Sequence, residues 1–341
     1  MQYFPDLLGN KELKERMGQL ITAGKLPHAL ILEGGNGIGK RFFARRLAAA
    51  LVCRKKHENI ATLPCMSCTA CRKVMDGLSP DIHYISRGDK TTIGVDAIRA
   101  IRSDMYLSSA EEDKKVYIIE DAHTMTVAAQ NALLIVLEEP PENVHIILTA
   151  ESCEALLLTI RSRAQLARMT ALTKEELSEF ADRQPAILQL KKNHPDAYEE
   201  AMLASMGRAG EFLHLSNRTE ASALLARRES VYRLIGALAE RKGLDAVLDA
   251  VKSIMGKRRD LREDLNTLLL ALRDLCLIDK DENAPLIFYT HRDIALLHSA
   301  ALGGRRLHAI YDIVEDALNS AERNANLHLM QTSLATALVA G

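Results

Sequence analysis

The sequence predicts an α/β nucleotide-binding core with a mostly parallel sheet, followed by an all-helical region. Short apolar runs alternate with amphipathic stretches from residue 29 to residue 169, as strands joined by crossover helices do. A glycine-rich turn, Gly34–Lys40, joins the first apolar run to the helical pattern after it. Beyond Met169 the strand signals stop, and the remaining residues have the pattern of helices rich in Ala and Leu.

Composition excludes several classes of protein. At 341 residues the chain has room for two or three domains. Its formal net charge of -1 argues against a surface coated in positive charge for nucleic acid, although a local basic face is compatible with it. No stretch reaches the roughly 20 apolar residues that span a bilayer, and the first residues lack a signal-peptide pattern. We therefore expect a cytoplasmic protein that makes no membrane contact.

The core is expected to contain five strands and the helices that connect them. Residues 1–28 form a leader with a helix from about Lys11 to Ala23. Apolar runs predict strands over 29–32, 80–86, 116–119, 145–149 and 165–169. Amphipathic stretches predict helices over 41–53, 96–106 and 127–139. Such sheets carry helices on both faces and bind nucleotides at the carboxyl ends of their strands.

The turn Gly34-Gly35-Asn36-Gly37-Ile38-Gly39-Lys40 has the spacing of a phosphate-binding loop. Its glycines let backbone N–H groups surround phosphate oxygens, and Lys40 would reach the β- and γ-phosphates. In such loops the next residue is Ser or Thr, whose hydroxyl binds Mg²⁺. Here it is Arg41, and a guanidinium cannot ligate a cation. We expect a site that can hold ATP or ADP but is impaired for Mg²⁺ and for hydrolysis.

Two acids, Glu120 and Asp121, follow the buried run 116–119. A carboxylate at the end of such a strand is where phosphate-loop proteins keep the ligand of magnesium or its water. Glu120 is therefore expected as the metal ligand and Asp121 as the base that positions water. The alternative is an ordinary polar strand end.

Four of the six cysteines fall within 19 residues, at a spacing of C-x11-C-x2-C-x2-C: Cys53, Cys65, Cys68 and Cys71. Two overlapping C-x-x-C pairs can wrap one side of an ion while Cys53 completes a tetrahedron. We expect a structural Zn²⁺, contributing on the order of 10 kcal/mol to local folding. The alternatives are four unrelated buried thiols, a thioredoxin-like redox pair, iron as the metal, or His57 as a reserve ligand.

The rest of the chain is expected to be helical. Residues 173–216 have the pattern of a small helical unit. A further all-helical region runs from there to residue 341, with helices over 261–277 and 310–322. Two short basic runs, at 257–259 and 305–306, are expected to be solvated faces rather than nucleic-acid contacts.

Several stretches together resemble the clamp-loader branch of the AAA+ ATPases found in bacterial DNA polymerase III, and its delta-prime type most. They are Leu26–Gly34, the four-cysteine insert, Ile93–Asp96, Asn131–Leu134 leading into Leu137-Glu138-Glu139-Pro140-Pro141, Ile160–Ala164, and the C-terminal fragments Lys257–Arg262 and Asn324–Asn326. The resemblance implies a AAA+ core over 1–169 with a zinc-binding insert at 53–71. It further implies a helical lid over 170–216 and a helical collar over 217–341 that assembles a five-membered ring.

The resemblance also implies partners. Such a subunit works with gamma/tau and delta subunits in a pentameric ring that opens a sliding clamp and places it around primer–template DNA.

The family's Ser-Arg-Cys motif maps onto Ser162-Arg163-Ala164, with Ala164 in place of the cysteine. Arg163 is therefore expected to act in trans, as an arginine finger in the ATP site of a neighbouring subunit. The alternative is an arginine that merely solvates a helix end.

Three further matches concern the chain's own site. Thr149 matches the polar sensor at the end of the strand over 145–149, and Arg208 matches the second sensor, in the lid. The family's Asp-Glu pair is reversed here as Glu120-Asp121, and a displacement near 1 Å can cost roughly 10²-fold in a positioned reaction. Intrinsic ATP turnover should therefore be slow or absent.

Two other functions are alternatives to a subunit of the delta-prime type. A gamma/tau-type motor subunit would hydrolyse its own ATP, but Arg41 stands where that subunit has a hydroxyl residue. An unrelated phosphate-loop ATPase with a zinc knuckle would explain neither the Ser-Arg motif nor the Leu-Glu-Glu-Pro-Pro segment.

Overall fold

The computed structural model describes residues 1–58, 61–256, 261–321 and 326–340. The chain divides into two compact units. One unit comprises Met1–Arg183 together with Gly207–Glu211, and the other Gln184–Met206 together with Phe212–Gly341. The expected domain boundaries at 169/170 and 216/217 stay predictions. The basic run 257–259 lies outside the described residues, as do most of Lys257–Arg262 and Asn324–Asn326.

The first unit is built on five parallel strands in the order β4-β5-β6-β2-β7. They are β4 (Ile82–Ile85), β5 (Lys115–Ile119), β6 (Val144–Ala150), β2 (Ala29–Glu33) and β7 (Gln165–Arg168). The expected mostly parallel α/β core is confirmed. Pairing of Ile119 with Leu148 and of Leu32 with Thr149 ends β5, β6 and β2 at the same edge.

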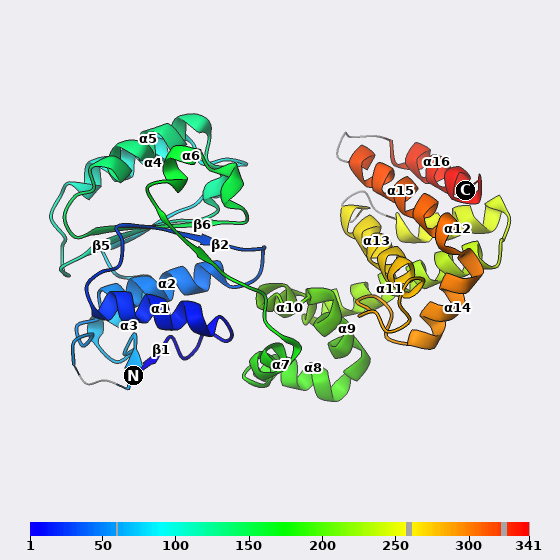
Figure 1. The fold of residues 1–341 in the computed structure, drawn as a ribbon, viewed down its shortest axis with the longest axis horizontal. Helices are drawn as coiled ribbons and strands as arrows, with labels where there is room; N and C mark the ends of the chain where they lie inside the picture. The colour runs from blue at the N-terminus through cyan, green and yellow to red at the C-terminus, as the bar shows by residue number, and fades with distance from the viewer. Residues whose placement is uncertain (59–60, 257–260, 322–325, 341) are drawn as a thin grey trace. The chain divides into compact units, whose positions relative to one another are not determined.

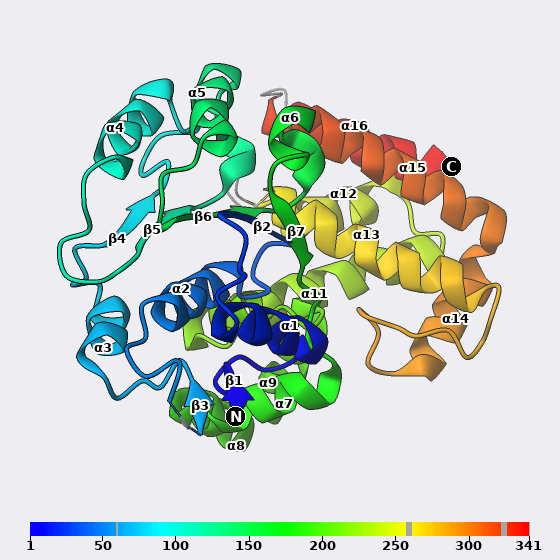
Figure 2. The same ribbon diagram turned by 60° about the vertical axis from the view of Figure 1, so that its left-hand side comes forward.

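Helices cover both faces of this sheet (Figure 1). One face carries α1 (Lys11–Thr22), α2 (Lys40–Leu51) and α3 (Thr69–Asp76); the other carries α4 (Val95–Met105), α5 (Val127–Glu138) and α6 (Leu158–Arg161), as a second view also shows (Figure 2). Alternate strand residues enter two separate cores: Leu30 and Leu32 pack with Leu47 of α2, whereas Ile31 packs with Leu133 of α5. This period of two is what a sheet buried on both faces requires.

Some short elements were not expected. Gln2–Tyr3 (β1) pairs in parallel with Thr62–Leu63 (β3), and two 3₁₀ turns, Ala122–Thr124 and Cys153–Ala155, follow β5 and β6. Two-residue strands carry no hydrophobic period of their own, so only their pairing in the fold reveals them. The helix expected over 41–53 runs from Lys40 to Leu51, which leaves Cys53 just beyond its end.

The second unit is helical. Its helices are α8 (Pro185–Asn193), α9 (Pro195–Ser205), α11 (Arg218–Ala239), α12 (Leu244–Ile254), α13 (Leu261–Ile278), α14 (Arg292–Leu302), α15 (Gly304–Ala321) and α16 (Leu327–Ala340). α7 (Lys174–Asp182) lies in the first unit, and α10 (Ala209–Leu215) has residues in both. The apolar faces of α11 to α16 share one core that includes Leu234, Leu272 and Ile310. In the described part of the chain, no helix is both long and apolar enough to cross a membrane.

A buried carboxylate anchors the connection between α13 and α14. The fully buried side chain of Asp274 accepts hydrogen bonds at 2.8, 2.6 and 3.1 Å from the backbone N–H groups of Ile287, Phe288 and Tyr289. Its other oxygen pairs with Arg273 at 3.0 Å. One side chain therefore satisfies three backbone donors, two of them buried, that no helix or strand pairs.

We expect Asp274→Ala to lower the free energy of unfolding by about 3 kcal/mol or more, because three N–H groups, two of them buried, lose a charged acceptor. Chemical denaturation followed by circular dichroism measures the change. The matched control is Asp249→Ala, since Asp249 is exposed on α12 and should change stability by less than about 0.5 kcal/mol. Equal effects of the two variants would contradict the anchoring role.

Candidate nucleotide site, finger residue and metal centre

The phosphate-loop sequence leaves the carboxyl end of β2, and α2 begins at Lys40. Glycine is required where other backbone approaches the loop. A Cβ at Gly37, whose φ is +78°, would lie 3.1 Å from the backbone nitrogen of Glu211. The Gly210 N–H donates to the Gly37 carbonyl at 2.7 Å, and a Cβ at Gly37 would lie 3.5 Å from that of Arg208. The structure thus puts Arg208 beside the loop, and its role as the second sensor stays a prediction.

Lys40 is folded under the loop. Only 6% of the residue is exposed, and its Nζ donates to the carbonyls of Gly34 at 2.7 Å and Gly35 at 2.8 Å. Burial lowers the pKa of Lys40, because the ammonium is withdrawn from water. Its direct partners in the described structure are neutral carbonyl oxygens, so the buried cation has no carboxylate in contact with it.

Arg41 forms ion pairs with Glu120 and Asp121, the two acids that follow β5. Its Nη2 is 2.6 Å from Asp121 Oδ2, and its Nε is 3.2 Å from Glu120 Oε2. Asp121 has a φ of +51°, and its N–H donates to Thr149 Oγ1 at 3.0 Å. Burial raises the pKa of Glu120, although Arg41 opposes that shift. The structure therefore brings the predicted residues Arg41, Glu120, Asp121 and Thr149 together at one edge of the sheet.

These residues do not fit a magnesium site of the usual kind. The position that supplies a hydroxyl in such sites holds Arg41, and a guanidinium has no lone pair for a metal. Both carboxylates that would bind the metal or its water are instead ion-paired with that guanidinium. From the sequence, Arg41 and the reversed pair Glu120-Asp121 are two separate departures from the usual magnesium site. In the structure they contact each other, because Arg41 is ion-paired with both acids.

Arg163 follows α6 and faces the end of α5. Its Nη2 is 3.0 Å from Glu138 Oε1, and its Nη1 donates to Thr159 O at 3.1 Å. About a third of the side chain is exposed (36%). Sequence reasoning missed Glu138 as a partner of Arg163, although Glu138 belongs to the Leu-Glu-Glu-Pro-Pro segment that carries the resemblance.

The four predicted cysteines form one cluster. All four Sγ atoms lie within 4.8 Å of one another, and those of Cys65 and Cys71 are 3.9 Å apart. Tetrahedral zinc with Zn–S bonds near 2.3 Å separates its sulfurs by about 3.8 Å. Backbone N–H groups also point at the sulfurs, from Cys68 to Cys65 and from Cys71 to Cys68, each at 3.4 Å. The cluster fits a structural metal such as zinc, and four unrelated thiols are excluded.

The thiols of the cluster differ in acidity. A hydrogen bond from Cys71 lowers the pKa of Cys53 to about 5, and the same contact together with burial raises the pKa of Cys71. A bound cation would favour the thiolate of both residues, with release of a proton.

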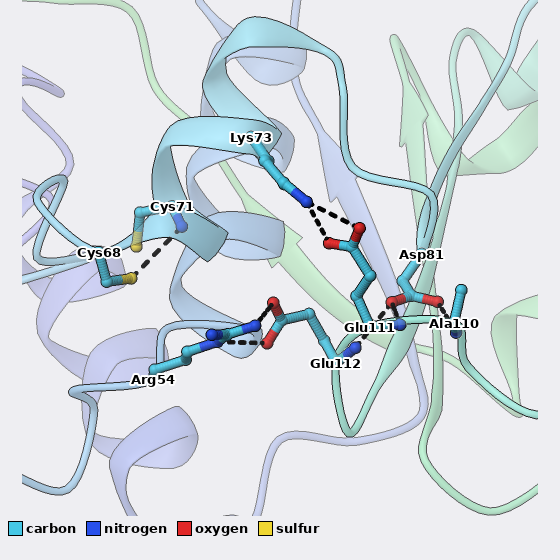
Figure 3. Close-up of polar contacts among 8 residues, drawn as sticks. All are labelled: Arg54, Cys68, Cys71, Lys73, Asp81, Ala110, Glu111 and Glu112. Carbon is cyan, nitrogen blue, oxygen red and sulfur yellow. Dashed lines mark hydrogen bonds and ion pairs between the residues drawn. The ribbon is translucent and has the colours of Figure 1, made fainter.

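Figure 3 shows how ion pairs tie the cysteine insert to the core. Arg54 contacts Glu112 at 2.8 Å, and Lys73 of α3 contacts Glu111 at 2.6 Å. Asp81, fully buried just before β4, accepts three consecutive backbone N–H groups of residues 110–112 at 2.6, 2.9 and 2.8 Å. One loop thus holds both ends of the insert. Sequence reasoning missed this network, because its members are separated by 29 to 58 residues.

Comparison with known proteins shows which proteins this chain resembles. A family model described as "DNA polymerase III, delta subunit" matches residues 9–173. The chain is 29% identical over 284 residues to the DNA polymerase III subunit delta' of Bacillus subtilis (strain 168), and the match covers 81% of each chain. The chain is thus similar to clamp-loader subunits of DNA polymerase III over most of its length. The expected resemblance to the delta-prime type is confirmed.

The chain is also similar to gamma subunits. The chain is 33% identical over 179 residues to the DNA polymerase III subunit gamma of Buchnera aphidicola subsp. Acyrthosiphon pisum (strain APS), a match of 52% of this chain. The match spans about half (48%) of the length of that relative. Among solved structures, the chain is similar to a gamma subunit-related protein from Thermotoga maritima, at 20% identity and a TM-score of 0.44, over 96% of this chain and 98% of that chain.

We expect the purified protein to carry one Zn²⁺ per chain, because the four sulfurs match tetrahedral thiolate spacing. Elemental analysis measures the content. Cys68→Ser should lose most of the metal and unfold at a lower temperature, whereas Cys276→Ser, at a half-buried cysteine on α13, should keep the metal. Full zinc retention by Cys68→Ser would contradict the four-thiolate site.

Proposed function

We propose that the chain is a delta-prime-type subunit of the DNA polymerase III clamp loader. It supplies Arg163 in trans to a neighbouring ATPase subunit, and its own nucleotide site is degenerate for hydrolysis. The observation that carries the proposal is the double ion pair of Arg41 with Glu120 and Asp121. The relative of delta-prime type, matched over 81% of each chain, supports the same assignment.

The double ion pair opposes catalysis in two ways. Charge-assisted contacts hold both acids, so neither is free to bind a metal ion or to orient water. No hydroxyl at position 41 can replace the lost ligand. Hydrolysis in this class of site depends almost entirely on positioning and charge, so turnover should be slow or absent.

Arg163 has the properties that a finger acting in trans requires. Its side chain is partly exposed at the end of α6, and its ion pair with Glu138 is also partly exposed. Exposed pairs of this kind contribute about 0–1 kcal/mol, so a neighbouring phosphate can displace Glu138 at little cost. A finger at the transferring phosphate is worth on the order of 10³–10⁵ in rate.

The partners follow from this role. The chain would assemble with gamma/tau and delta subunits into a pentameric ring, and would act on the sliding clamp and primer–template DNA through that complex, in the cytoplasm. The cysteine cluster would hold Zn²⁺ as a structural ion, because its four thiols leave no open coordination position for catalysis.

The second candidate is a gamma/tau-type motor subunit. The 33% identity to a gamma subunit over half of this chain favours it. Arg41 and its two ion pairs argue against it, because a motor needs both acids for its metal and water.

The two candidates differ in steady-state ATP hydrolysis by the purified chain alone, with magnesium present. We expect no turnover above background, because Arg41 blocks both acids. Turnover of about 1 s⁻¹ or more would favour the motor and overturn the proposed degenerate site.

In the assembled ring, Arg163→Ala should leave assembly intact and reduce ATP hydrolysis, because one active site loses its finger. Size-exclusion chromatography and a coupled ATPase assay measure the two properties. Glu138→Gln is the matched control: it removes the intramolecular partner of Arg163 but keeps the arginine, so the activity of the ring should be retained. Unchanged hydrolysis by the Arg163→Ala ring would remove the finger assignment.

A further inference from the structure

A side-chain cation stands where phosphate-loop proteins keep a metal ion. The first residue after Lys40 normally supplies a metal ligand, and the acids after β5 hold the metal or its water from the other side. Here Arg41 comes from the first position and contacts the acids at 2.6 and 3.2 Å. Its positive charge therefore lies on the carboxylates that a magnesium ion or its water would need.

Arg41 also retains binding capacity. The two ion pairs use Nε and Nη2, and 58% of the side chain is exposed. Nη1 takes part in neither of these two ion pairs, so it can donate to an incoming ligand. A guanidinium presents several N–H donors in one plane, a geometry that matches phosphate oxygens and carboxylates alike. One arginine can thus be anchored by two acids and still donate to a phosphate.

The buried ammonium of Lys40 also favours the binding of an anion at the phosphate loop. Its buried ammonium has carbonyl oxygens of Gly34 and Gly35 as its contacts. Loop N–H groups and the start of α2, whose first turn has no side-chain cap, add further positive potential. Two side-chain cations next to these donors can balance much of the charge that a di- or triphosphate carries.

We propose that Arg41 substitutes for magnesium, so that the chain binds ATP or ADP as the metal-free nucleotide. Glu120 and Asp121 hold the guanidinium, and Arg41 and Lys40 neutralise the phosphates together. The inference deepens the proposed function, since it rests on the same degenerate site and specifies the form of its ligand. It also explains how a site that cannot hydrolyse nucleotide can still retain one.

Mg²⁺ should bind only weakly at Glu120 and Asp121. Mg²⁺ needs near-octahedral oxygen ligands at 2.0–2.1 Å and loses its water reluctantly. A dication approaching Asp121 or Glu120 meets the charge of Arg41 and must displace it from both acids. A nucleotide that carries its own Mg²⁺ would bring a second cation to a position that is already filled.

The test is isothermal titration calorimetry of the full chain with ATP and with ADP, in excess magnesium chloride and in EDTA. We expect the wild-type affinity in EDTA to match or exceed that in magnesium. Arg41→Ser restores a hydroxyl and frees both acids, so its affinity should rise at least about tenfold when magnesium replaces EDTA. Arg99→Ser, which removes an exposed arginine of α4, is the matched control and should behave as wild type.

Two results would overturn the inference: wild-type binding that requires magnesium, or no binding in either buffer. Lys40→Ala should abolish binding under both conditions, which assigns the signal to the loop. Neither overturning result affects the finger role of Arg163, which the ring assay measures separately. Conversely, ATP hydrolysis by the isolated chain would overturn the degenerate site, whatever the binding data show.

Discussion

The hydrogen-bonded register of three parallel strands determines where the groups of the nucleotide site lie. β2 pairs with β6 from Ala29 to Glu33, and β5 pairs with β6 up to Ile119. Their carboxyl ends therefore meet at one edge, which brings the turn after β2 next to the acids after β5. A shift by one residue would turn Leu30 and Leu32 to the opposite core, so the buried faces enforce the register. The stability of the sheet and the geometry of the site thus share one cause.

Local patterns predicted much of this arrangement. The glycine spacing, the buried strands and the cysteine spacing depend on residues close together in the chain, and their physical requirements can be read from one segment. The contact between Arg41 and Asp121 joins residues 80 apart, so the sequence could indicate that each was unusual but not that they pair. The same limit applies to Arg163 with Glu138 and to Asp81 with the loop at 110–112. Each depends on how two helices or strands are brought together.

Two arginines, Arg41 and Arg163, show how context changes the chemistry of one side chain. Both are paired with carboxylates of their own chain. Arg41 bridges two acids beside a buried lysine, whereas Arg163 has one partly exposed acid as its ion-pair partner at a helix end. The first arrangement favours a fixed cation and the second an exchangeable one. Residue type alone could not separate these cases, because the difference lies in the number and the exposure of the partners.

The anchor at Asp81 links parts of the molecule that differ in chemistry. The loop it holds contacts both ends of the cysteine insert, and the same loop leads within three residues into β5, which ends at Ile119, one residue before Glu120. A change at this one carboxylate would disturb the metal insert and the strand that carries the acids together. In genetic terms, Asp81 is a position where a single substitution should produce two defects. A suppressor that restores only one of them would separate the two paths by which the loop acts.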